Sequence, residues 1–253
     1  MKRYLLKGAA TVAALLFWIL LWHLVSTKIN LSLVLPAPLE VLKRLGELAC
    51  TADFYQTMGT SLLRVSSGYL AGVIAGVFLG FLAFYVSLFR ALISPVMGVI
   101  RATPVASFIL VVLLWIHRDG IPGFISFLMV LPIVWQNTLL GFERRDGRLS
   151  EMAKVFRFGR LKTLIRVDLP QVLPFVFSSA RAGMGLAWKA GVAAEVLALP
   201  KASIGLMIYN SKMYLETVDL YAWTLAIILI SVALEKLVFF LFSRKKGGIP
   251  VEA

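Results

Sequence analysis

Apolar residues run through most of the chain in long stretches that are separated by short polar segments. A helix that crosses a bilayer needs about 20 predominantly apolar residues. Six stretches approach that length, so six transmembrane helices are predicted near residues 8–26, 60–87, 91–116, 121–142, 171–199 and 219–242. Arg101 and Pro104 interrupt the third of them. An even number of crossings places both termini on the same side of the membrane.

A shorter amphipathic segment follows the first stretch. Pro38 stands at a favourable position for the first turn of a helix, and the apolar residues after it return at helical spacing. The residues on the shared face are Val41, Leu42, Leu45, Leu48 and Ala49. This pattern predicts a short helix that packs on the outer membrane surface.

Residues 143–170 break the apolar pattern with a strongly basic segment. An apolar stripe at spacing i, i+3, i+4 and i+7 is formed by Leu149, Met152, Ala153 and Phe156. A second, shorter stripe is formed by Leu161, Leu164 and Ile165. Gly159 offers a turn between the stripes, and Pro170 offers an end to the second one. We therefore expect two short amphipathic helices, which either lie on anionic lipid headgroups or insert into a groove of a cytoplasmic partner.

The composition favours an integral membrane protein over other classes. The chain is 60% hydrophobic and 15% charged, with a mean hydropathy of +0.87. A soluble domain is about 45–50% apolar and about 25% charged. The single cysteine, Cys50, allows no disulfide within the chain and no cysteine-based metal site. His23 and His117 lie far apart in the sequence, so we expect neither a metal nor a cofactor.

The distribution of charge predicts the orientation of the helices. Basic residues of membrane proteins gather in cytoplasmic loops, so the net charge of +13 indicates membrane topology rather than binding of nucleic acid. Eight basic residues lie between Arg144 and Arg166. Others flank the outermost stretches, namely Lys2, Arg3 and Lys7 before the first and Arg244, Lys245 and Lys246 after the last. Both termini and the 143–170 loop are therefore predicted to be cytoplasmic, with the first stretch kept as an uncleaved span.

Four glycines repeat every fourth residue along the second stretch, at Gly68, Gly72, Gly76 and Gly80. On a helix this spacing forms a face without side chains, which another backbone can approach closely. The face predicts close helix–helix packing. The contact is either static within the bundle or mobile during a transport cycle.

The basic loop resembles the cytoplasmic EAA loop of ABC-importer permeases, whose pattern is Glu-Ala-Ala, a glycine four residues on, and an aliphatic-x-Leu-Pro ending. The matching residues are Glu151, Met152, Ala153, Val167, Asp168, Leu169 and Pro170. The chain departs from the pattern at Met152, where alanine is usual, and at Arg157, where glycine is usual. A glycine there permits the turn between the two helices, and we expect Gly159 to take over this role.

The resemblance continues over about residues 35–242. The stretches "LPAPLEVL", "SLLRVSSGYLAGVIAGVFLG", "RATPVASF" and "GMGLAWKAGVAAEVLALP" are similar in order and spacing to the nitrate/sulfonate/taurine branch of these permeases. It implies an all-α integral membrane protein with one permease domain over residues 1–253, in the plasma membrane of a bacterium or archaeon.

The family also implies partners. Two copies of the chain would form the translocation path, two cytoplasmic ABC ATPase subunits would each bind one 150–170 loop, and an extracytoplasmic solute-binding protein would deliver the solute. The residues implied in coupling to the ATPase are Glu151, Met152, Ala153, Phe156, Arg157, Gly159, Leu169 and Pro170. The chain has no glycine-rich phosphate-binding loop ending in Lys-Ser/Thr. ATP hydrolysis is therefore expected on the partner, and the chain is not expected to be an enzyme.

Charged residues also fall within the predicted spans, where a charge costs about 2.5–3.5 kcal/mol at the bilayer centre. Lys189 and Glu195 lie in the fifth stretch and Arg101 in the third. One hypothesis is that Lys189, together with Arg101, attracts an anionic solute in the pore. The alternative is a structural pairing of Lys189 with Glu195 or with a neighbouring helix.

Two other functional classes fit the sequence less well than an importer. An intramembrane enzyme would need a catalytic constellation, and none is visible among the scattered acids, the two histidines and the one cysteine. A passive channel or scaffold would not need a loop shaped to bind an ATPase. The importer is expected to carry a small anion of the nitrate, sulfonate or taurine type. A non-anionic small metabolite is the alternative solute.

Overall fold

The computed structural model describes residues 2–243, and this part of the chain is helical without β-strands. The basic residues Arg244, Lys245 and Lys246 lie outside the described range. The elements are α1 (Lys2–Ile29), α2 (Pro38–Ala49), α3 (Ala52–Tyr85), α4 (Ser87–Ala102), α5 (Val105–Val112), the 3₁₀ turn η1 (Arg118–Gly120), α6 (Ile121–Glu143), α7 (Gly147–Val155), α8 (Arg160–Thr163), the π-helical turn η2 (Leu164–Asp168), α9 (Leu169–Ala198), α10 (Ile204–Met213) and α11 (Thr217–Ser243).

Helices occupy all six predicted stretches. Within the described part of the chain, three segments are long and apolar enough to cross a membrane, namely Ala52–Tyr85, Arg118–Glu143 and Thr217–Phe240, and the bent pair α4–α5 makes a fourth if it counts as one span. The segment Ala13–Ile29 of α1 is apolar but shorter. The remaining helix, α9, carries charged residues at Arg181, Lys189 and Glu195.

The third predicted stretch is a broken helix rather than a straight one. Helix α4 ends at Ala102, α5 begins at Val105, and the two axes are bent by 104°. Pro104 is extended, with φ −60° and ψ 132°, and stands at the start of α5. Because proline has no amide hydrogen and disfavours the helical conformation in the residue before it, the break falls where the sequence predicted an interruption.

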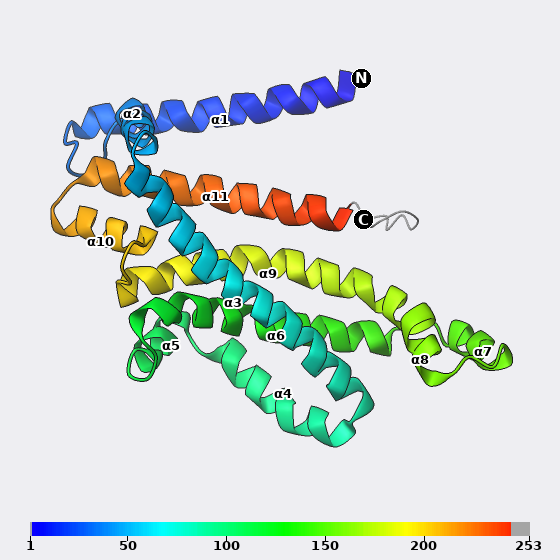
Figure 1. The fold of residues 1–253 in the computed structure, drawn as a ribbon. Helices are drawn as coiled ribbons and strands as arrows, with labels where there is room; N and C mark the ends of the chain where they lie inside the picture. Colours follow the sequence, from blue (N-terminus) through cyan, green and yellow to red (C-terminus); the bar gives the residue numbers. More distant parts are fainter. Residues whose placement is uncertain (1, 244–253) are drawn as a thin grey trace.

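Helix α6 lies at the centre of the fold and is packed between α3 and α9 (Figure 1). Its side chains are buried on most sides. Val130 and Val134 of α6 belong to one apolar cluster with Trp188 of α9. The glycine face of α3, made by Gly68, Gly72, Gly76 and Gly80, is turned toward α6. A methyl group at Gly68 would lie 1.9 Å from the carbonyl oxygen of Gly123, so these helices touch at the backbone.

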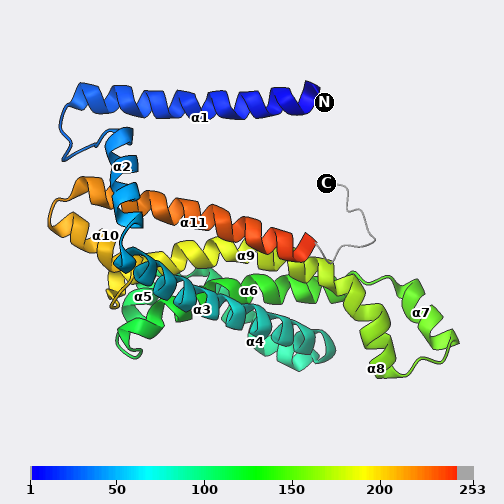
Figure 2. The same cartoon turned by 45° about the horizontal axis from the view of Figure 1, so that its top comes forward.

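The helices run between two ends that differ in character. At one end, here called the α10 end, lie α2, α5, α10 and the first turn of α11 (Figure 1). At the other, the loop end, lie the first turn of α1, the last turn of α11 and the α7–α8 loop, and Figure 2 shows the same arrangement. The described parts of both terminal helices therefore point to the same end as the basic loop.

Helix α2 forms as predicted, but it packs across the start of α11. Val41 is buried, whereas Leu42 is exposed. Arg44 donates two hydrogen bonds to the carboxylate of Asp219, from Nε at 2.6 Å and from Nη2 at 2.9 Å. Hydrogen bonds from Arg44 to Asp219 and then to Glu47 raise the pKa of its guanidinium above the ordinary value. This bidentate pair fixes α2 on α11.

Helix α1 stands apart from the rest of the fold (Figures 1 and 2). It is tied down near its end, where the Trp22 indole N–H donates to the carbonyl oxygen of Pro36 at 3.1 Å and the ring lies 6.0 Å from that of Tyr221. Large apolar side chains such as Leu16 and Trp18 are exposed along it. Since lipid or another protein must cover such side chains, α1 carries an unpartnered apolar surface.

Candidate functional site

The basic segment between α6 and α9 forms two short helices, as the two apolar stripes predict. Helix α7 begins after Asp146, whose carboxylate accepts the N–H of Arg148 at 2.9 Å. Helix α8 follows after a short turn and continues through η2 into α9. The pair projects beyond the helix bundle at the loop end (Figure 2).

Arg157, and not Gly159, makes the turn between the two helices. Arg157 has φ +52°, in the left-handed region, whereas Gly159 is extended at φ −64°. The N–H of Arg157 donates to the carbonyl oxygen of Lys154 at 2.9 Å, and that of Phe158 donates to Ala153 at 2.9 Å. These two bonds define a Schellman motif with Arg157 at the position that glycine usually takes. The expected transfer of the turn to Gly159 is therefore wrong.

The loop presents apolar side chains away from the rest of the chain. Met152, Val155 and Phe156 are exposed on α7, and Phe156 retains 67% of its accessible surface. The neighbouring Glu151 is also exposed. The predicted stripe does not lie in one environment, because Ala153 is buried whereas Leu149, Met152 and Phe156 are exposed. The outer surface of α7 therefore combines exposed apolar side chains with charges.

Pro170 does not end the second helix as predicted, because helical structure continues from Arg160 to Ala198. The N–H of Leu169 donates to the carbonyl oxygen of Leu164, five residues back, and this bond closes the π-helical turn η2. Pro170 follows in the first turn of α9, where a missing N–H is tolerated. Leu169 is half-buried, and Pro170 is exposed.

An ion pair closes the base of the loop. Nη1 of Arg145, which precedes α7, lies 2.6 Å from Oδ2 of Asp168, which ends η2. Sequence reasoning included Asp168 only as the variable position of the motif and did not single out Arg145. Their separation of 23 residues gave no helical periodicity that could pair them.

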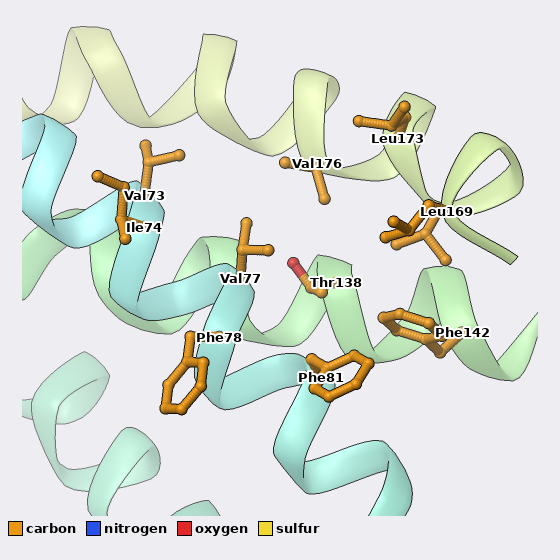
Figure 3. A pocket seen from close by; sticks show the side chains of 11 residues that line it. Val73, Ile74, Val77, Phe78, Phe81, Thr138, Phe142, Leu169, Leu173 and Val176 are labelled. Carbon is orange, nitrogen blue, oxygen red and sulfur yellow. The ribbon is translucent and has the colours of Figure 1, made fainter. Parts of the chain in front are cut away.

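Leu169 also lines an apolar groove between α3, α6 and α9, with a volume of about 410 Å³. Figure 3 shows apolar side chains from the three helices around it, including Val77, Phe81 and Val176, and the hydroxyl of Thr138 turned inward. The Thr138 hydroxyl has no hydrogen-bond partner within the described chain. The groove is suited to apolar contact and offers little to a charged solute.

Glu195 is fully buried near the α10 end and does not pair with Lys189. Its Oε2 accepts the hydroxyl of Ser61 on α3 at 2.9 Å and the N–H of Gly205 on α10 at 3.2 Å. The same Ser61 oxygen accepts the N–H of Ile204 at 3.0 Å. Glu195 thus joins α3, α9 and α10 through hydrogen bonds, and its Oε1 has no partner among the described residues.

Lys189 and Arg101 are exposed on this single chain. The Arg101 guanidinium donates from Nη1 to the side-chain oxygen of Gln136 on α6. The structure brings neither cation to Glu195, so the expected structural pairing of Lys189 with Glu195 is wrong. It also shows no contact between Lys189 and Arg101. Both cations remain available to a cavity or to another chain.

No cluster of three or more histidine, cysteine, aspartate or glutamate side chains that could hold a metal occurs within the described residues. A bundle of apolar helices with a projecting two-helix loop is typical of proteins that cross a membrane several times. Comparison with known sequences identifies the family.

Residues 68–244 match the family described as "Binding-protein-dependent transport system inner membrane component". This match covers more than half of the chain, which belongs to that family of ABC transporter permeases and is an inner-membrane component. The fold agrees with this assignment. A crystal structure of a bacterial ABC transporter involved in the import of the acidic polysaccharide alginate has a TM-score of 0.59 at 16% identity, and 97% of each chain is covered.

Relatives of named function belong to several transport systems. The nitrate import permease protein NrtB of Leptolyngbya laminosa is 32% identical, over 91% of this chain and 86% of the relative. The putative aliphatic sulfonates transport permease protein SsuC of Bacillus subtilis is 25% identical, over 75% and 68%. The bicarbonate transport system permease protein CmpB of Synechococcus elongatus is 28% identical, over 62% and 57%.

Proposed function

We propose that the chain is the membrane-spanning subunit of an ATP-driven importer, and that α7 and α8 couple solute translocation to two cytoplasmic ATPase subunits. The observation that carries the proposal is the shape of the loop. Exposed Met152, Val155 and Phe156 lie on a helix whose end is fixed by the Arg157 turn. Burying such side chains in a groove of a partner is favourable by about 1.5–3 kcal/mol each, which a loop in water would forgo.

The proposed topology has six crossings, with both termini and the α7–α8 loop in the cytoplasm. The common end at which α1 begins, α11 finishes and the loop projects supports it (Figure 1). The basic residues of the 143–170 segment lie at that end, as the positive-inside rule requires. In this scheme the α10 end faces the extracytoplasmic solute-binding protein, and two copies of the chain enclose the path.

The first test is co-purification of the tagged chain from its native membrane, compared with a variant that carries Glu151→Arg and Phe156→Asp. We expect an ABC ATPase to accompany the native chain and to be lost from the variant. The matched control is Ser87→Arg with Leu88→Asp, which changes exposed residues at the loop end outside α7. A native chain that retains no ATPase under gentle extraction would contradict the proposal, as would a channel that still conducts after the loop is altered.

The proposed solute is a small anion. Support comes from the relatives named for nitrate, sulfonates and bicarbonate and from Lys189, which is exposed on α9, a helix that crosses the membrane in the proposed topology. A charge in that position normally faces a cavity or a partner. We expect Lys189→Gln to reduce uptake of nitrate or taurine about tenfold or more, and Lys212→Gln at the α10 end to leave it near the native value. Equal uptake of nitrate or taurine by both variants would contradict a role of Lys189 in attracting the anion.

A further inference from the structure

The base of the α7–α8 loop holds an ion pair between the half-buried Arg145 and the buried Asp168. The Asp168 side chain retains 6% of its accessible surface and that of Arg145 21%. Nη1 of Arg145 is 2.6 Å from Oδ2 of Asp168, while Oδ1 of Asp168 is buried without a hydrogen-bond partner in the described chain. Desolvation of two charges offsets most of what such a pair gains, so stability alone explains it poorly.

The pair joins the two ends of the loop to three membrane helices. Nε of Arg145 donates to the carbonyl oxygen of Phe142 at 3.0 Å, at the end of α6. The guanidinium carbon lies 4.6 Å from the ring centre of Phe84 on α3. The ring of Tyr85, beside Phe84, lies 6.1 Å from that of Phe142 on α6. A movement of α3 or α6 relative to η2 and α9 must therefore stretch or break this contact.

The π-helical turn explains why Asp168 points inward. A π-helical turn contains one residue more than an α-helical turn. This extra residue in η2 changes the direction in which the residues after it point. Asp168 is the last residue of η2 and is buried, as is Val167, whereas Ile165 and Arg166 are exposed. The wide turn thus sets Asp168 opposite Arg145, and a directional contact results where an apolar side chain would pack without fixed direction.

We propose that Arg145 and Asp168 are positioning residues that fix the angle of the α7–α8 loop and transmit its displacement to α3, α6 and α9. This inference rests on the proposed function, since it assigns the route by which ATPase movement reaches the membrane helices. Neither residue needs to touch the ATPase. Variants at the pair should therefore still bind the ATPase while losing the ATP-driven change at the α10 end.

The test uses the full complex of the chain with its ATPase and a reporter cysteine at the α10 end. Lys212→Cys in a Cys50→Ser background supplies the reporter, and its rate of reaction with a maleimide is measured with and without MgATP and vanadate. ATPase binding and ATP turnover are measured on the same samples. We expect Arg145→Gln and Asp168→Asn to keep ATPase binding and to reduce the ATP-driven change in rate about tenfold, within the usual range of coupling between sites.

Two double variants keep the test decisive if a single variant folds poorly. The charge swap Arg145→Asp with Asp168→Arg should restore part of the response. Arg145→Met with Asp168→Leu removes both charges without leaving either one unpaired, so it should fold and bind the ATPase but respond weakly. A native response from this apolar variant would overturn the proposal whatever the single variants do.

The matched control is the Arg90–Glu143 pair, which joins α4 to the end of α6 at 2.5 Å and is more exposed, at 48% and 37%. Arg90→Gln should leave the ATP-driven response near native. A loss as large as that of Arg145→Gln would mean that the effect is not specific to the loop base and would overturn the proposal. Failure of the native chain to bind an ATPase would overturn the proposed function itself, a result distinct from native behaviour in the variants.

Discussion

Glu195 illustrates how a buried carboxyl group can act as a fixed hydrogen-bond acceptor. Its carboxylate meets the first turn of α10, where the N–H of Gly205 donates to Oε2 at 3.2 Å. A helix N-terminus carries unpaired N–H groups and a partial positive charge, both of which favour a carboxylate. The approach is close enough to exclude any side chain at Gly205, since an added Cβ would lie 2.4 Å from the Cβ and carbonyl carbon of Glu195.

Gly205→Ala should therefore destabilise the protein, by about 1–3 kcal/mol or more, because the methyl group would force α10 away from α9. Thermal unfolding of the purified chain in detergent measures the change. Gly46→Ala on α2 is the control, since no atom lies within 4 Å of its added Cβ, and it should be neutral or stabilising by up to about 1 kcal/mol. Equal effects of the two changes would contradict the close contact between Glu195 and Gly205.

The left-handed backbone at Arg157 leads to a second prediction at this scale. A residue with a side chain is strained by roughly 1–2 kcal/mol there, so Arg157→Gly should raise the stability of the chain by about 1 kcal/mol or slightly less. Gly159→Ala should be near neutral, because Gly159 is extended and its added Cβ meets nothing within 4 Å. The same unfolding assay measures both variants, and a loss for Gly159→Ala without a gain for Arg157→Gly would place the turn at residue 159 instead.

At the scale of the elements, apolar periodicity predicted well where a helix packs along its length. Helices at the six predicted stretches follow from the length of the apolar runs, and α2 and the two-helix loop follow from the helical spacing of their apolar residues. The 104° angle between α4 and α5 could not be predicted, because Pro104 marks a break but packing sets its direction. Helix α10 was missed although Ser203, whose side chain accepts the N–H of Leu206 at 3.1 Å, is a recognisable N-cap.

The candidate site was less predictable than the helices for a physical reason. Lys189 and Glu195 are six residues apart on one helix, yet Glu195 bonds to Ser61, 134 residues away. Contacts of that separation leave no local pattern. The contact between Arg145 and Asp168 was not predicted for the same reason. The turn at Arg157 was misassigned because propensity favours glycine, whereas the two hydrogen bonds of the Schellman motif hold an arginine in the left-handed region.

The contact of α3 with α6 yields a graded prediction. Added methyl groups would lie 1.9 Å from a backbone oxygen at Gly68, 2.7 Å from side chains at Gly76 and Gly80, and 3.0 Å from the nearest atom at Gly72. Gly68→Ala should therefore destabilise most, by about 1–3 kcal/mol or more, and Gly72→Ala least. Gly59→Ala, on the same helix in open space, is the control. Unfolding midpoints in detergent would test the order, and a flat series would exclude close static packing.

At the scale of the whole molecule, the fold arranges its chemistry by end. The loop end carries α7 and α8 with their cations, and the α10 end carries the Glu195 network and the Arg44–Asp219 pair (Figure 1). Helix α6, packed between α3 and α9, runs between the two ends and has buried apolar side chains along its length. A displacement at one end can reach the other through these rigid elements only if their contacts at both ends hold.

This arrangement makes the orientation of the chain testable with its own cysteine. Cys50 follows α2 at the α10 end and is exposed, so in intact cells stripped of outer layers it should react with a membrane-impermeant maleimide. In a Cys50→Ser background, Ser87→Cys is the matched site, because Ser87 is exposed in the α3–α4 turn at the loop end. It should react only after the membrane is opened, since the two positions are separated by the length of α3. If Ser87→Cys is labelled in sealed cells while Cys50 of the native chain is not, the topology is the reverse of the proposed one. The α7–α8 loop would then lie outside, where no ATPase could bind it.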